Sequence, residues 1–580
     1  MIADFILSAP GSVQEEIKAG VDYLRAKHAA SDSVVLGNYT LYRFGKNIPE
    51  STSAKSHQVF VFGFLVYKGK YNQEAAISIL AEQNPDWNKA YGNYCIISFI
   101  TGKPQFYLDP LRKFFVFRNK QTGLISSSFL ASLHMAGQLT INKAAFLERL
   151  TTGSSIAPKT IFNEIGRLYS TADYDLIANK SFALDTSRKF NNEKEALENQ
   201  FAVLQNYFAD IKEFTATNLT DIGLSMGYDS RLILAAALKN DIQDIQLHTH
   251  SINGVGKHAK EQVIVKSIAK AFNLPLKIVE TNSFNRLHGD NLQALILDNW
   301  TYFDGLSSYN MGSLTETYTR KYKEQVLGQD YNVALNGLGG EIYRNYFNLA
   351  NKGFDYDLLA QNFFLYKFSE DLVGKEQLQT VIGNLKEEIN NRLGIEIKDT
   401  IHYKDVRRYV AEMRMVDGYA CNHNAHNKIS YFLTPFIEPE VYHAAYNIYP
   451  YTGITGTFEG KLIERFHPVL ARSIPTQYGK SALHTSKKLW LTSFLKASTS
   501  QKMIRKKLDY QKNTPNFAAV NIAFKNHIAT ESEVFRKAWE NMAEQIKYVN
   551  WDKIHYEFAC MVNASMMAMT FYQFRDKIKN

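Results

Sequence analysis

Runs of apolar residues separated by short polar turns divide the first third of the chain into strands. Continuous apolar runs predict buried strands at residues 59–67, 91–99 and 105–108. A further run at 125–130 leads into a helix-like segment. The pattern predicts an antiparallel sheet domain over residues 1–185.

The pattern changes after a polar, charged stretch at residues 186–200, which begins a helix that runs to about residue 214. Strands then alternate with helices, which predicts a parallel sheet whose ligands lie at the carboxyl ends of its strands. The remainder, residues 355–580, reads as largely helical. We therefore predict a second, α/β domain over 186–580. Its strands are expected at 222–224, 245–250, 276–279 and 333–335, and its helices at 232–238 and 259–272.

The stretch LSMGYDSR, residues 224–231, joins an apolar strand to a helix that is apolar on every side. Such a junction directs unpaired backbone N–H groups and a helix N-terminus toward an anion. Ser225 and Ser230 can donate to phosphate oxygens, and Gly227 allows the backbone to approach closely. Asp229 would repel a bare phosphate, so it implies an intervening Mg²⁺. The lysine of a Walker loop is missing.

A second glycine-rich turn, NGLGGE at residues 336–341, follows the apolar strand at 333–335. It carries one acid, Glu341. Two loops from neighbouring strands that each bring one carboxylate can hold Mg²⁺ on the phosphates of ATP. We therefore predict Asp229 and Glu341 as metal ligands.

Both loops resemble those of the ATP pyrophosphatases (PP-loop), in the form carried by the asparagine synthetase family. The first is similar to S-G-G-x-D-S and the second to S-G-x-G-[AS]-D-E, although Met226, Asn336, Leu338 and Glu341 depart from the family pattern. The resemblance implies ATP and Mg²⁺ as cofactors. It implies an ATP-binding set of Leu224, Ser225, Gly227, Asp229, Ser230, Ser251 near the adenine, Asn336 and Gly337.

The N-terminal segments resemble, in their order, the glutaminase domain that precedes the synthetase domain in this family, which implies an Ntn-hydrolase-like α+β sandwich. Those glutaminases use an N-terminal cysteine as nucleophile. Here Ile2 follows Met1, and the first cysteine is Cys95. The resemblance therefore implies an inactive amidotransferase domain and a reaction that does not use glutamine.

The C-terminal part resembles the family at a lysine that follows an Ile-Pro step, Ile474-Pro475. The family's lysine contacts the acyl phosphate, and this catalytic role is carried onto Lys480, with Lys461 as the substitute. Leu338 stands where relatives have a proton-accepting Glu or Tyr, and leucine cannot accept a proton. The base is expected to be Glu370, Asp371 or a group of the substrate.

The charge and the cysteine content indicate what kind of protein this is and where in the cell it is expected. The net charge is +9, and nine Lys/Arg face one acid between Tyr478 and Lys512. That run is interpreted as a solvated helical face or a rim that attracts an anionic substrate; no binding module for nucleic acid accompanies it. The three cysteines contain no C-x-x-C pair, and no window of about 18 apolar residues occurs, so a soluble, cytoplasmic protein is expected.

Together these features predict an ATP-dependent ligase that forms AMP, pyrophosphate and an amide. It would adenylate the carboxylate of a small molecule or peptide for attack by an amine, on a specialised substrate such as a peptide macrolactam, a metabolite or a surface glycan. A carrier or precursor peptide is a possible partner. Two alternatives stay open: an ammonia-dependent asparagine synthetase, and a non-catalytic binding or scaffold homologue.

Overall fold

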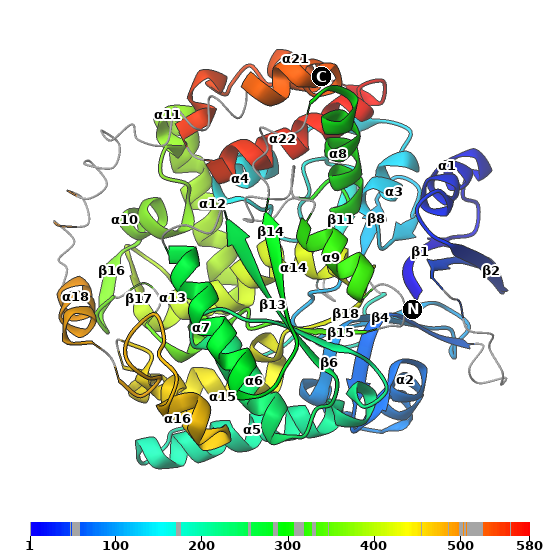
Figure 1. The fold of residues 1–580 in the computed structure, drawn as a ribbon. Helices are drawn as coiled ribbons and strands as arrows, with labels where there is room; N and C mark the ends of the chain where they lie inside the picture. Colours follow the sequence, from blue (N-terminus) through cyan, green and yellow to red (C-terminus); the bar gives the residue numbers. More distant parts are fainter. Residues whose placement is uncertain are drawn as a thin grey trace.

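The fold is seen in a computed structural model of the chain, drawn in Figure 1. The structure describes residues 2–46, 48, 58–169, 176–252, 257–281, 288–306, 318–327, 332–345, 347, 349–453, 455–484, 486–497, 503, 506, 526–556 and 558–579.

Two antiparallel sheets form the N-terminal part, in blue and cyan at the right of Figure 1. The larger sheet has the order β11-β8-β9-β1-β3-β2 and the smaller has the order β5-β4-β6-β7. The strands are β1 Ile2–Ser8, β2 Ala30–Leu36, β3 Tyr39–Gly45, β4 Val59–Tyr67, β5 Lys70–Tyr71, β6 Ala90–Ser98, β7 Gln105–Leu108, β8 Phe117–Asn119, β9 Ile125–Ser126 and β11 Ile165–Arg167.

Apolar side chains on the facing sides of these sheets form a common core. The rings of Phe5 and Phe62, one from each sheet, lie 4.5 Å apart. Helices α1 (Gln14–Arg25) and α3 (Phe129–His134) pack on the outer face of the larger sheet, and α2 (Asn72–Ala81) packs on the outer face of the smaller. The predicted antiparallel domain is present as a sandwich of two sheets, in the layer order helix, sheet, sheet, helix. Helix α4 (Lys143–Thr152) follows.

A parallel sheet of five strands, in the order β14-β13-β12-β15-β18, forms the centre of the second part. Its strands are β12 Thr220–Gly223, β13 Ile245–Ile252, β14 Leu276–Thr281, β15 Val333–Leu335 and β18 Tyr431–Leu433. The first four confirm the predicted strands and the parallel arrangement. The fifth, β18, comes from the region expected to be helical.

Helices cover this sheet because alternate strand residues are apolar on both faces. In β15, Val333 and Leu335 contribute to the core that contains α6, whereas Ala334 contributes to the core on the other side. Figure 1 shows α6 and α7 in front of the sheet and α5 along its lower edge. The helices of this region are α5 Glu193–Thr215, α6 Asp229–Lys239, α7 Lys257–Ala271, α8 Gly289–Tyr302 and α9 Tyr318–Val326.

The C-terminal part is largely helical, as predicted. Two stretches, Ala360–Phe364 and Val410–Tyr419, are π-helices. The α-helices are α10 Tyr356–Leu359, α11 Ser369–Val373, α12 Lys375–Leu393, α13 Tyr403–Tyr409, α14 Ala420–His426, α15 Pro439–Asn447, α16 Thr457–Phe466, α17 Pro468–Arg472, α18 Lys487–Ala497, α21 Glu533–Gln545 and α22 Phe558–Gln573. Short strands β16 (Gly353–Asp355) and β17 (Thr400–His402) pair with each other.

The N-terminal and C-terminal parts are joined closely. Helix α22 packs against α4, and β19 (Ile578–Lys579) pairs in parallel with β10 (Leu139–Thr140). A buried ion pair, Lys113 Nζ to Glu438 Oε1 at 3.1 Å, crosses the same boundary. The boundary at residue 185 itself stays a prediction.

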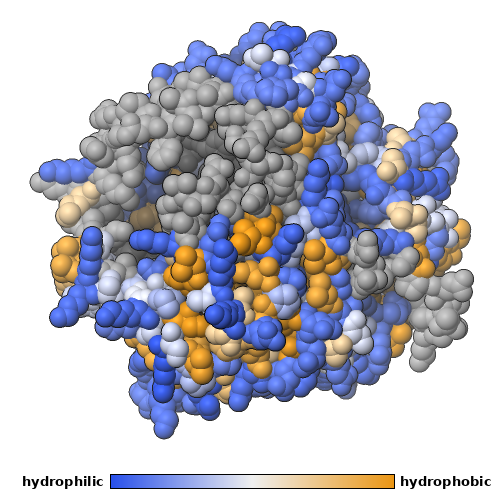
Figure 2. All heavy atoms as spheres, in the orientation of Figure 1, coloured by the Kyte–Doolittle hydropathy of each residue, from blue (hydrophilic) through white to orange (hydrophobic). Residues whose placement is uncertain are grey.

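Helix α18 presents apolar side chains to solvent. Trp490, Leu491, Phe494 and Leu495 are each about half exposed, and Figure 2 shows this apolar patch at the left edge of the molecule, where α18 lies in Figure 1. Among the described residues, no helix is long and apolar enough to cross a membrane.

His134 at the end of α3 gives the fold a pH-dependent element. Its ring stacks on Tyr23 with centroids 4.6 Å apart and meets Phe574 edge-on at 4.9 Å. Burial, with Lys577 and Lys27 nearby, lowers the pKa of His134 to about 4. The unfolded chain takes up this proton near pH 6.5, so the free energy of unfolding should fall as the pH drops from about 6.5 toward 4.

We expect His134 to account for about 1–2 kcal/mol of that loss, because the ring is only partly shielded from water. Urea unfolding at pH 7 and pH 5 measures it. His134→Phe should reduce the pH dependence, whereas the exposed control His484→Phe should leave it as in the wild type. An equal pH dependence in wild type and His134→Phe would contradict the assignment.

Candidate functional site

The first predicted loop lies at the carboxyl end of β12 and is closed by its own serines. The backbone N–H of Ser225 donates to Ser230 Oγ at 3.0 Å, and the two hydroxyl oxygens are also 3.0 Å apart. The N–H of Gly227 donates to Ser225 Oγ at 3.1 Å. Helix α6 begins at Asp229, so this small polar loop and a helix N-terminus occupy one end of the parallel sheet.

The second glycine-rich loop packs directly against the first. A Cβ atom added at Gly337 would lie 2.9 Å from the backbone nitrogen of Ser230. One added at Gly340 would lie 2.2 Å from Asp229 Oδ1, closer than any real Cβ contact. Glycine is required at both positions because no side chain fits between the loops. The structure therefore brings together Asp229 and Glu341, which the sequence predicts as a pair.

Arg344 binds both carboxylate oxygens of Asp229. Its Nη1 donates to Oδ1 at 2.6 Å and its Nη2 to Oδ2 at 2.9 Å, a two-pronged contact. The same Nη1 lies 3.2 Å from Glu459 Oε2 on α16. Burial opposes the charge on Arg344, but Asp229 and Glu459 outweigh it and raise its pKa. Sequence reasoning missed both Arg344 and Glu459, which lie 115 residues from their partners in this cluster.

Three carboxyl groups surround the single positive charge of Arg344. Burial, and after it the charge of Asp229, raises the pKa of Glu341 and that of Glu459. One carboxylate oxygen on each, Glu341 Oε2 and Glu459 Oε1, is buried without a hydrogen-bond partner among the described residues. Oxygen atoms of this kind are the ligands that Mg²⁺ prefers, so the residues present fit the ion.

The other residues of the predicted ATP set surround the same loops. The N–H of Leu224 donates to the carbonyl of His248 on β13 at 2.8 Å, and Asn336 Oδ1 accepts from the N–H of Leu338 at 2.8 Å. Ser251 lies in β13, but its side chain is outside what the structure describes. Glu261 on α7 accepts from the N–H of Met226 at 3.3 Å and so supports the first loop.

The segment that contains Lys480 lies against the first loop. The N–H of Gln477 donates to the carbonyl of Met226 at 3.0 Å, and the ring of Tyr478 stacks on that of Tyr228 at 4.8 Å. Lys480 itself is exposed. Lys461, on α16, instead pairs with Glu193 at 2.7 Å.

Several other predicted residues lie elsewhere or outside the described chain. Glu370 and Asp371, named as possible bases, lie on α11, which packs against α12. Of the basic run after Tyr478, Lys487 and Lys488 are exposed on α18, and Lys506, beyond that helix, is also exposed. Lys496 lies on α18, but its side chain is outside what the structure describes. The basic residues outside the described part are Lys502, Arg505, Lys507 and Lys512.

A pocket opens beside the acid cluster. Glu341, Arg344 and Arg407 form its polar side. Apolar and aromatic side chains from α13, α15 and the π-helix form the rest, among them Tyr403, Met415 and Tyr442. π-Helical turns occur frequently at functional sites. The cluster therefore adjoins a mainly apolar space that is built from the helical part of the chain.

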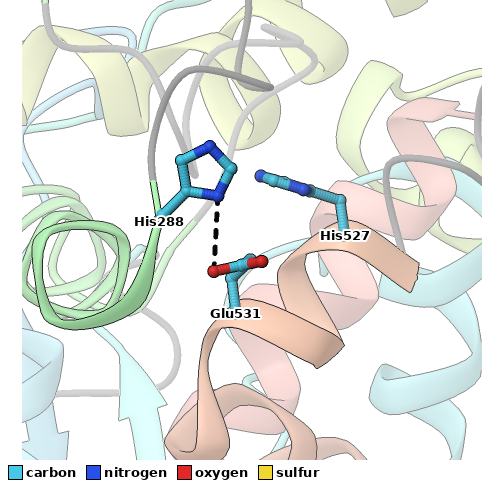
Figure 3. A group of neighbouring side chains, drawn as sticks. All are labelled: His288, His527 and Glu531. Atoms are coloured by element: carbon cyan, nitrogen blue, oxygen red, sulfur yellow. Dashed lines mark ion pairs between the residues drawn. The ribbon is translucent and has the colours of Figure 1, made fainter.

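A second group of possible metal ligands lies away from both loops. His288 and Glu531 face each other, with Nδ1 3.4 Å from Oε2, and the ring of His527 lies 5.3 Å from that of His288, as Figure 3 shows. All three ligand atoms lie within 4.8 Å of one another. Two imidazoles and a carboxylate suit zinc rather than Mg²⁺. The sequence analysis did not identify this group, because its histidines are far apart in the chain.

Comparisons with known proteins leave the family open. No protein-family model and no curated protein matches the chain. Among solved structures, the chain is similar to the U34-tRNA thiolase NcsA from Methanococcus maripaludis with its 4Fe-4S cluster. The identity is 11%, the match covers 50% of this chain and 81% of that one, and the TM-score is 0.19. At that TM-score the likeness carries no argument about function. What characterises the chain is its own geometry: a parallel sheet with two carboxylate-bearing loops at the carboxyl ends of neighbouring strands.

Proposed function

We propose that the protein is an ATP-dependent amide synthase that adenylates a substrate carboxylate and releases pyrophosphate. The observation that carries the proposal is the direct packing of the 224–231 loop on the 336–341 loop, which places Asp229 beside Glu341. The resemblance of both loops to those of asparagine synthetases supports it. The proposal includes a PP-loop fold for residues 186–580 and an Ntn-like, inactive amidotransferase fold for residues 1–185.

Each group of residues in the site has its own proposed role. The N–H groups and hydroxyls of the first loop bind the phosphates of ATP, and the N-terminus of α6 stabilises their charge. Asp229 and Glu341 hold Mg²⁺, which when bound neutralises charge on the leaving pyrophosphate. Arg344 keeps the Asp229 carboxylate in one orientation. The apolar pocket beside Glu341 holds the body of the substrate.

Exchange of radioactive pyrophosphate into ATP tests this proposal. Purified protein is given Mg²⁺ and a panel of carboxylic acids that includes aspartate, acidic sugars and peptides. Pyrophosphate exchange that depends on one carboxylic acid of the panel would support adenylation and would identify that acid as the acyl substrate. Exchange with aspartate, followed by asparagine formation from ammonia, would favour the ammonia-dependent asparagine synthetase instead. Failure to bind Mg-ATP would contradict the proposed enzymatic activity and would favour a non-catalytic scaffold protein.

Lys480 provides a prediction about the second half of the reaction. Lys480→Ala should lower the rate of amide formation by about tenfold or more, because the lysine charge would stabilise the acyl phosphate region. ATP binding should change little. Lys488→Ala, an exposed lysine of α18, is the matched control and should keep the full rate. Equal rates of amide formation in Lys480→Ala and Lys488→Ala would contradict a catalytic role for Lys480.

A further inference from the structure

A small cavity lies between the N-terminal sandwich and the C-terminal helices. It shares no lining residue with the pocket beside Glu341. Phenylalanine rings form one side of it. Charged residues from both parts of the chain form the other: Arg149 on α4, Lys159, Arg167 on β11 and Asp417 in the π-helix.

Most charges around this cavity are matched. Asp417 pairs with Arg167 at 2.9 Å and also with Arg392. Lys159 Nζ lies 3.0 Å from a carboxylate oxygen of Glu148 and 3.1 Å from one of Glu388. Asp417, Glu148 and Glu388 are therefore each paired with a cation other than Arg149.

Arg149 is the exception. Its side chain is buried, with 6% exposed, and Nε and Nη2 have no hydrogen-bond partner within the described part of the chain. No acid of that part lies within ion-pair distance of it. Arg167 Nε, in the wall of the same cavity, is also buried without a partner. A guanidinium group stays protonated in proteins, so within the described part of the chain burial leaves this positive charge uncompensated, which is costly.

We propose that this cavity binds a small monocarboxylate, with its carboxylate on Arg149 and its apolar body against Phe115, Phe117 and Phe129. The planar guanidinium offers parallel N–H groups that match the two oxygens of a carboxylate. The surrounding ion pairs leave one positive charge in excess, which one negative charge balances. The carboxylate of Asp417 in the wall disfavours an anion with two charges, such as phosphate.

This inference is independent of the proposed amide synthesis, since no residue of the two loops takes part. The ligand would lie between α4 and β11 of the N-terminal part and the π-helix of the C-terminal part. A bound carboxylate would therefore connect the two parts of the chain as well as neutralise Arg149.

Thermal unfolding of the full chain tests the proposal with acetate, benzoate and phenylacetate as probes. Sodium chloride and sodium phosphate at equal ionic strength are the references. Acetate should raise the Tm most, because the cavity is small, and isothermal titration with acetate should give a Kd of about 1 mM or tighter. Arg149→Met should abolish the rise and weaken binding by about tenfold or more. The same rise with chloride or phosphate, or an undiminished rise in Arg149→Met, would overturn it.

A comparison without ligand makes the test sharper. In carboxylate-free buffer, Arg149→Met should melt at or above the wild-type temperature, because it removes an uncompensated charge. The matched control is Arg112→Met. Arg112 is also buried but donates to the carbonyls of Leu108 and Asn179 at 3.1 and 2.6 Å, so this variant should melt lower. Asp229→Ala should keep the full carboxylate response, which separates this site from the ATP site. A lower Tm in Arg149→Met than in Arg112→Met would contradict the proposal.

Discussion

Asp229→Ala should reduce pyrophosphate exchange by about 10³-fold. The side chain lies at the contact between the two loops, against Gly340 and near Glu341. Its removal takes away a proposed ligand for Mg²⁺ and frees Arg344 to place its positive charge elsewhere. Initial exchange rates at saturating ATP measure the effect.

The fold should survive this substitution, since Arg344 would still pair with Glu459 at 3.2 Å. Circular dichroism and the Tm check that directly. Asp357→Ala, an exposed acid in the first turn of α10, is the matched control and should exchange like the wild type. A folded Asp229→Ala protein with normal exchange would mean that the loops do not bind the phosphates of ATP.

Gly340→Ala should destabilise the protein by about 1–3 kcal/mol and remove most exchange activity. The added methyl group would sit 2.2 Å from Asp229 Oδ1, so either the second loop or the Asp229 carboxylate must move. Both movements separate the acids that the proposed site needs together. Urea unfolding and exchange assays on the same preparation measure the two effects.

The control for Gly340→Ala is Gly383→Ala, within α12, where an added methyl group meets nothing within 4 Å. That substitution should stabilise the protein by about 0.5–1 kcal/mol, because alanine loses less backbone freedom in a helix. A Gly340→Ala protein as stable and active as Gly383→Ala would show that the two loops are not in close contact.

The local pattern of the chain predicts much of the fold. Strands such as β4 and β15 are recognised because they are short apolar runs that end in turn residues, and α6 because its apolar residues continue for about two turns. The parallel arrangement follows from strands that alternate with helices. β18 was missed because three apolar residues inside a helical region give no signal of their own; pairing with β15 makes them a strand.

The site was predictable only where chemistry and local sequence coincide. Asp229 and Glu341 stand in glycine-rich turns at strand ends, a visible signal. Arg344 and Glu459 carry no such signal, because their role comes from contacts across 115 residues of chain. Likewise, Arg149 reads as an ordinary helical residue, and only burial in the folded protein shows that its charge is unmatched.

The pairing of β19 with β10 has a consequence for the order of folding. Lys577 Nζ donates to the carbonyls of Leu133, His134 and Ala136, contacts that span more than 440 residues. Contacts between such distant residues form late, because the loop that they close is long. During synthesis β10 must therefore wait for residues 577–579 before it gains its partner, and it stays without that partner until the C-terminal part of the chain has been translated.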